Sequence, residues 1–97
     1  MTRVSFHELA ERELNDAALY YERESGGLGI KFLDEIERCI GAIINNPNAG
    51  KKVRGRVRRR LLRTFPYGIL YSINNSDIRI LAIMNLKRRP MYWVGRS

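Results

Sequence analysis

Residues 5–45 read SFHELAERELNDAALYYERESGGLGIKFLDEIERCIGAIIN. Their apolar side chains recur at spacings of three and four on both sides of Gly26-Gly27. This period predicts two amphipathic helices, over 5–25 and 28–45, with the glycine pair as the turn between them. Because so few residues separate the helices, we expect them to pack against each other as an antiparallel hairpin.

Residues near both ends of this hairpin carry helix-boundary signals. Ser5 and Glu8 match the S-x-x-E capping box and predict the first helix's start. His7, the only histidine, is expected to be a surface or capping residue. Pro47 pushes the residue before it out of the helical region, so the second helix should stop there.

The second half of the chain changes to short β-branched and aromatic runs separated by turn signals. We expect strands over 58–65, 69–73 and 78–84. They predict a three-stranded antiparallel meander packed on the helical hairpin, to which residues 2–4 could add a fourth, edge strand. The fold class is therefore α+β, as one domain over residues 1–97. Alternation along the third strand predicts one shared apolar face for Ile78, Ile80, Ala82 and Met84.

Charge is distributed very unevenly between the two halves. Residues 1–50 carry five Lys/Arg and nine Asp/Glu, whereas residues 51–97 carry thirteen Lys/Arg and one acid, Asp77. The densest part, KKVRGRVRRRLLR at 51–63, has eight cations and no acid. Such a run predicts an anionic partner: a nucleic acid bound through its phosphates, or an acidic peptide laid across the sheet.

Basic and aromatic side chains alternate again in residues 87–96, KRRPMYWVGR. This mixture suits RNA, through phosphate contacts and base stacking. Alternatively, Trp93 and Tyr92 could hold this segment against the sheet, and for Trp93 we favour this structural role. Tyr92, a phenol near several arginines, is a candidate acid or base.

Several kinds of site are excluded by the residue inventory. The basic half has no histidine and one carboxylate, so we expect no metal, no cofactor and no Ser/His/Asp triad there. Cys39, the only cysteine, lies among isoleucines at helical spacing and is expected to fill the core. If the basic half cleaves RNA, the reaction would have to proceed without a metal ion and use Arg, Lys and Tyr side chains.

No stretch is apolar and long enough for a signal peptide or a membrane span. With a single cysteine, the chain also lacks the disulfides of small secreted domains. We therefore expect a soluble, cytoplasmic protein.

Taken together, the element order and several short segments resemble the RelE/ParE superfamily of toxins from bacterial type II toxin–antitoxin systems. The matching pieces are Ala10-Glu11, Leu14, Tyr20-Tyr21, Gly29, Phe32, Ile36, Pro47, Arg60 to Arg63, Phe65-Pro66-Tyr67, Ile69, Tyr71, Ile80-Leu81-Ala82-Ile83, Arg88-Arg89-Pro90-Met91-Tyr92-Trp93 and Arg96. The F-P-Y and R-R-P-x-Y-W segments are closer to the ParE-like branch.

This resemblance implies a growth-inhibiting toxin neutralised by an acidic antitoxin, in a toxin–antitoxin hetero-oligomer, with a role in plasmid stabilisation. ParE-like members poison DNA gyrase without catalysis, whereas RelE-like members cut mRNA on the ribosome. The resemblance does not settle the target; we favour a non-catalytic gyrase inhibitor, with a metal-free, ribosome-dependent mRNA endoribonuclease as the alternative. Asn85 stands where such members often carry histidine, so this copy could be attenuated or purely regulatory.

The resemblance and the charge pattern also give candidate site residues. The nuclease alternative would use Arg60, Arg88 and Tyr92. Residues expected to bind the target or the antitoxin are Arg56, Arg58, Arg60, Arg63, Lys87, Arg88, Arg89, Trp93 and Arg96.

Overall fold

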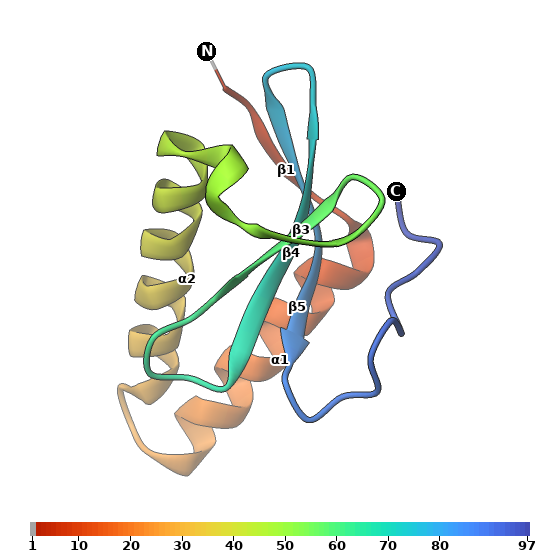
Figure 1. Cartoon of the computed structure of the whole chain (residues 1–97). Coiled ribbons are helices and arrows are strands. Elements are labelled where there is room, and N and C mark those ends of the chain that lie inside the picture. Colours follow the sequence, from red (N-terminus) through yellow and green to blue (C-terminus); the bar gives the residue numbers. More distant parts are fainter. Residues whose placement is uncertain (1) are drawn as a thin grey trace.

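A computed structural model describes residues 2–97. Its elements are β1 (Val4–Phe6), α1 (Glu8–Glu24), α2 (Leu28–Asn45), the 3₁₀ helix η1 (Pro47–Ala49), β2 (Lys51–Arg54), β3 (Val57–Leu61), β4 (Tyr67–Asn74) and β5 (Asp77–Asn85). The strands form one 5-stranded sheet in the order β1-β5-β4-β3-β2. Both helices lie on one side of this sheet, and the C-terminal segment runs along the other (Figure 1). The predicted α+β architecture is confirmed.

The helical hairpin forms as predicted, but α1 starts later than the sequence indicated. Ser5 belongs to β1, so the predicted Ser5–Glu8 capping box is wrong. His7 is the N-cap instead, and its Nδ1 accepts a 3.0 Å hydrogen bond from the backbone N–H of Leu9. Pairing of β1 with β5 keeps Ser5 extended, and this tertiary contact outweighs the local capping signal.

The turn between the helices combines a glycine and a carboxylate. Gly27 has φ of 89°, a left-handed conformation that glycine adopts without steric cost. Glu22 of α1 accepts hydrogen bonds from the backbone N–H of Gly27 at 2.9 Å and of Gly29 at 3.0 Å. Its charge thus lies at the N-terminus of α2, where the helix dipole favours an anion.

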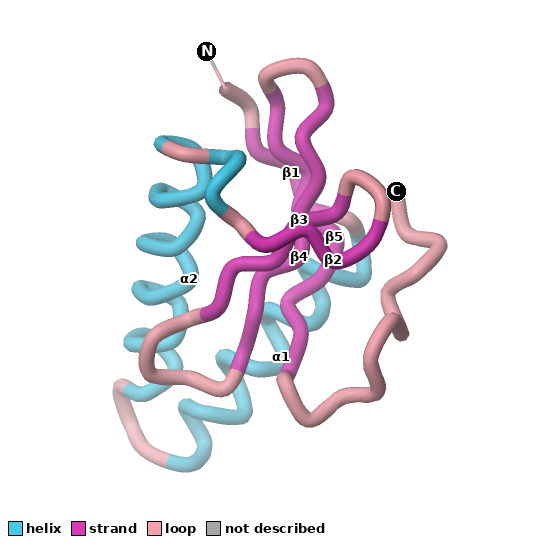
Figure 2. The backbone as a smooth tube through the Cα atoms, in the orientation of Figure 1, coloured by secondary structure: helices cyan, strands magenta, loops and turns pink. Residues whose placement is uncertain are grey.

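The sheet contains two strands that the sequence reading missed or misplaced. β2, within the basic run, pairs antiparallel with β3 (Figure 2). The predicted edge strand at 2–4 is instead Val4–Phe6, and it runs parallel to β5. The meander of β3, β4 and β5 is antiparallel, as predicted.

A bulge in β5 divides its side chains between the two faces of the sheet. The register shifts between Leu70 and Tyr71, which pair with Ala82 and Ile80 and leave Leu81 unpaired. Ile80 therefore packs toward the helices, while Ala82 packs on the opposite side. The prediction that all four alternating residues from Ile78 to Met84 share one face is wrong for this reason.

The main core lies between the helices and the sheet. Its fully buried members include Phe32 and Ile43 of α2 with Ile69 and Tyr71 of β4. Cys39 packs against this cluster, which confirms it as a core residue. Within residues 2–97, neither helix combines the length and the apolar character needed to cross a membrane.

Candidate functional site

The arginines of β3 alternate between the two faces of the sheet. Arg58 pairs with Tyr71 and Arg60 with Ile69, so both arginines lie on the helix side. Arg59 pairs with Leu70 and lies on the opposite side. The three arginines of β3 are therefore divided between the two faces of the sheet.

Arg58 has a structural role beside any role in binding. Its guanidinium donates hydrogen bonds to the carbonyl oxygens of Asn48, at 2.9 Å, and Gly50, at 2.8 Å. These bonds join β3 to the link between α2 and β2. Loss of Arg58 would thus disturb this link as well as remove a charge.

Arg60 lines a cavity of about 320 Å³ between α2 and β3. We call this the α2–β3 cavity; its lining is Glu35, Arg38, Cys39, Ala42, Arg60, Leu61, Leu62 and Arg63. Burial raises the pKa of the Cys39 thiol, which keeps it protonated and unreactive at neutral pH. The cavity therefore offers cations and an exposed Leu61 for contact with a partner, but no activated nucleophile.

Most of the predicted cationic binding residues have no carboxylate partner within residues 2–97. Of the thirteen Lys and Arg in residues 51–97, Arg96 alone pairs with a side-chain carboxylate in the described structure. The candidates that lie exposed are Arg56, Arg63, Lys87, Arg88 and Arg89. They leave a large unbalanced positive charge at the surface.

Trp93 holds the C-terminal segment, residues 86–97, against the sheet. Its side chain is 4% exposed and packs with Leu70, Ala82 and Met84 on the face opposite the helices. This confirms the structural alternative for Trp93. Its ring is covered by the protein itself and is not available for stacking on a base.

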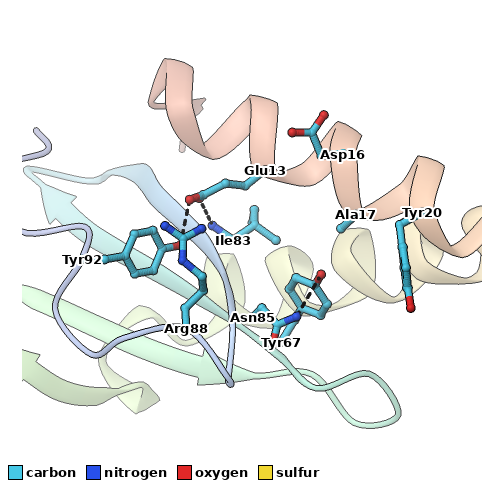
Figure 3. A pocket seen from close by; sticks show the side chains of 9 residues that line it. All are labelled: Glu13, Asp16, Ala17, Tyr20, Tyr67, Ile83, Asn85, Arg88 and Tyr92. Atoms are coloured by element: carbon cyan, nitrogen blue, oxygen red, sulfur yellow. Dashed lines mark hydrogen bonds between the residues drawn. The ribbon is translucent and has the colours of Figure 1, made fainter.

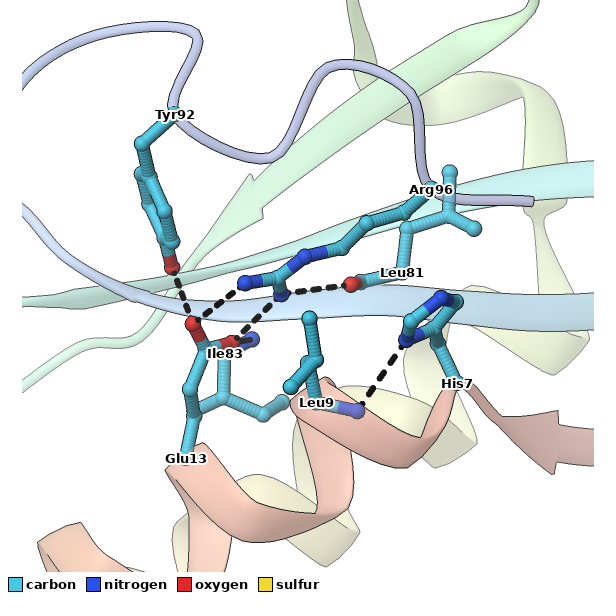
Figure 4. A network of polar contacts seen from close by, with 7 residues as sticks. All are labelled: His7, Leu9, Glu13, Leu81, Ile83, Tyr92 and Arg96. Carbon is cyan, nitrogen blue, oxygen red and sulfur yellow. Dashed lines mark hydrogen bonds and ion pairs between the residues drawn. The ribbon is translucent and has the colours of Figure 1, made fainter.

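Glu13 of α1 joins the C-terminal segment to the helix (Figure 4). It accepts hydrogen bonds from the Tyr92 hydroxyl at 2.8 Å and from both terminal nitrogens of Arg96 at 3.0 Å. Only 11% of the Arg96 side chain and 17% of the Glu13 side chain are exposed. Arg96, predicted as a binding residue, is therefore engaged in an internal ion pair.

The same ion pair satisfies backbone groups of β5 that no strand reaches. β1 pairs with β5 only from Ile78 to Ile80. Beyond that point, Glu13 accepts from the N–H of Ile83 at 3.1 Å and Arg96 donates to the carbonyl oxygen of Leu81 at 3.0 Å. Two side chains thus continue, past the bulge, the hydrogen bonding that β1 begins.

Glu13 was missed in the sequence reading, although a signal exists. It lies three residues after Ala10 and four before Ala17, both buried, so it belongs to the core-facing stripe of α1. A carboxylate at such a position needs a buried partner. An arginine in the basic half was the natural candidate.

A cavity of about 260 Å³ lies where α1, the sheet and the C-terminal segment meet (Figure 3). Tyr20 of α1, Tyr67 of β4 and Tyr92 are among its lining residues. Asn85, also in the lining, donates a long, 3.4 Å hydrogen bond to the Tyr67 hydroxyl. Asn85 therefore forms part of the wall of this cavity.

The three residues of the nuclease alternative are not brought together. Arg88 and Tyr92 line the cavity beside Asn85, with the guanidinium 4.0 Å from the ring centroid, whereas Arg60 lines the α2–β3 cavity. Burial, followed by the hydrogen bond and charge of Glu13, raises the pKa of Tyr92 above its ordinary value. A phenol in this state is a poor base at neutral pH.

Comparisons with known proteins agree with this fold. The model of the family described as ParE toxin of type II toxin-antitoxin system, parDE, matches residues 4–90. A solved structure titled "Chromosomal ParDE TA system from P. aeruginosa" is similar, with a TM-score of 0.77 and 19% identity, over 90% of this chain and 98% of that one. None of the curated proteins compared with the chain matches it. Because the family match spans most of its length, this chain belongs to the ParE family of type II toxins.

Proposed function

We propose that this toxin stops growth by binding and poisoning DNA gyrase, and that an acidic segment of its antitoxin neutralises it. The unbalanced cations of residues 51–89 carry this proposal, because a dense positive surface attracts an acidic protein and speeds its association. The ParDE match supports an antitoxin partner.

The α2–β3 cavity and the strands beside it suit the antitoxin. Arg60 and Arg63 supply charge, and Leu61, which is 49% exposed, supplies an apolar contact. An antitoxin segment rich in Asp, Glu and apolar residues would match both features. Its affinity should fall as salt rises, since exposed charge pairs are screened.

The geometry supports a binding inhibitor better than an endoribonuclease. Tyr92 donates its proton to an internal hydrogen bond, and Arg60 lines a different cavity from Arg88. Metal-free cleavage of RNA would need these groups around one phosphate. Binding to gyrase makes no such demand.

Supercoiling by purified gyrase tests the target. Added toxin should inhibit the reaction, and a molar equivalent of antitoxin should restore it. Unchanged supercoiling, together with mRNA cut on ribosomes, would replace this proposal with the RelE-like activity.

Charge reversal tests the antitoxin surface. Arg63→Glu should weaken antitoxin binding by about tenfold or more at low salt, because it introduces repulsion against an acidic segment. Lys31→Glu, an exposed cation on α2, serves as the matched control and should change the affinity much less. Equal losses in both variants would place the antitoxin elsewhere.

A further inference from the structure

Met91 has φ of 66°, in the left-handed region, and its side chain is 42% exposed. Among the described residues, the other non-glycine residue with positive φ is Asn75, in the β4–β5 turn, where asparagine tolerates this conformation. Methionine has no such tolerance, so this conformation costs free energy at Met91. Strained residues of this kind concentrate where a protein binds or acts.

Contacts on both sides of Met91 fix the chain around it. On the N-terminal side, Asn85 accepts hydrogen bonds from the backbone N–H of Lys87 and of Arg88, each 2.9 Å long. On the C-terminal side, Tyr92 is bonded to Glu13 and Trp93 is buried in the sheet. Residues 86–91 therefore form a loop fixed at both ends, which we call the basic loop.

The basic loop presents two apolar side chains among three cations. Leu86 is 44% exposed and Met91 is 42% exposed. Lys87, Arg88 and Arg89 are exposed, and within residues 2–97 none of them pairs with a carboxylate. Arg88 is held over the ring of Tyr92, so its guanidinium is oriented before any partner arrives.

We propose that the basic loop is the element by which this toxin binds its target, with Met91 entering an apolar depression whose rim is acidic. The inference rests on the proposed function and specifies its contact surface. An unbranched, polarizable side chain adapts well to such a depression. A loop that is already fixed in its bound form avoids the entropic cost of ordering on binding. The backbone strain at Met91 lowers the stability of the free toxin in exchange.

Met91→Asn and Met91→Gly distinguish the effect of the apolar side chain on binding from the effect of the backbone strain on stability. Both residues accept a left-handed φ, so thermal unfolding of either variant should occur at the wild-type temperature or above it. Both lack the apolar side chain, so inhibition of gyrase should need about tenfold more protein. Ile30→Ala, which removes a 60% exposed side chain on α2, is the control and should leave inhibition unchanged.

Growth arrest after induced expression reports on the loop whatever the target is. If wild-type protein arrests growth but leaves gyrase active, the gyrase proposal fails, and loss of arrest in the Met91 variants still supports the loop. Wild-type potency in folded Met91→Asn and Met91→Gly would overturn the inference. So would unfolding of both variants at a lower temperature than the wild type.

Discussion

The hydroxyl of Tyr92 donates a 2.8 Å hydrogen bond to the carboxylate of Glu13, a residue 79 positions earlier. The same carboxylate holds Arg96 and the N–H of Ile83. A partly buried carboxylate of the acidic first half therefore binds three groups of the basic second half. This contact fixes the C-terminal segment, which has no regular secondary structure of its own.

Glu13→Ala should cost about 3 kcal/mol of unfolding free energy, because it leaves the largely buried guanidinium of Arg96 without its counter-ion, with the carbonyl oxygen of Leu81 as its remaining acceptor. Glu8→Ala is the matched control. It removes the other described ion pair, Glu8–Arg12, which is 3.8 Å long and exposed, and should cost at most about 1 kcal/mol. Urea titrations of both variants measure the difference. Similar losses would show that the Glu13 contact adds little stability.

Tyr92→Phe should lower the unfolding free energy by about 1.5–3 kcal/mol, the usual contribution of a hydrogen bond to a charged group, and leave toxicity intact. The phenyl ring keeps the packing and the contact with Arg88. Growth arrest after induced expression checks the second part. Complete loss of toxicity in a folded Tyr92→Phe protein would instead support proton transfer by the phenol.

Glu35 makes stability depend on pH in the acid range. Burial alone would raise its pKa, but hydrogen bonds from the Thr64 hydroxyl and from backbone N–H groups outweigh burial and lower the pKa below its ordinary value near 4.5. Its contribution is therefore complete above about pH 4.5 and is lost as the pH falls through the lower, folded-state pKa.

Glu35→Gln should remove this part of the acid destabilisation. The unfolding free energy of the variant should therefore vary less than that of the wild type between about pH 5 and about pH 3, a range that brackets the transition. Glu37→Gln, an exposed carboxylate on the same helix, is the control. Urea unfolding at several pH values gives both profiles. Parallel profiles for the wild type and Glu35→Gln would contradict the assignment.

Gly50→Ala should destabilise the protein by about 1–3 kcal/mol, as overpacking usually does. A Cβ there would overlap the hydroxyl of Tyr71, a fully buried residue whose O–H donates to the carbonyl of Pro47 at 2.6 Å. Gly41→Ala provides the opposite case. It lies within α2 with open space around it, so alanine should stabilise the helix by about 0.5–1 kcal/mol. Thermal unfolding distinguishes the two directions.

The helical hairpin could be predicted because its apolar period and its glycine pair are local signals. β2 could not be predicted, because its sequence KKVR is mostly charged and lacks the alternation of a half-buried strand. Its position depends on pairing with β3. The bulge at Leu81 has no local signal either, so the shared face of Ile78 and Met84 was wrongly expected.

At the candidate site, composition predicted the exposed cations but not which arginines have internal partners. Arg58 and Arg96 resemble their neighbours in sequence, yet the fold places carbonyl oxygens beside the first and Glu13 beside the second. Such partners come from elements distant in sequence. Only the folded arrangement identifies them.

Glu13 and Arg96 also affect how copies of this chain can meet. With β1 and this ion pair along β5, one border of the sheet has few free backbone groups for a further strand. β2 forms the opposite border and carries Lys51, Lys52 and Arg54. If the β2 borders of two copies came together, these cations would repel one another. This repulsion opposes edge-to-edge aggregation of the free toxin.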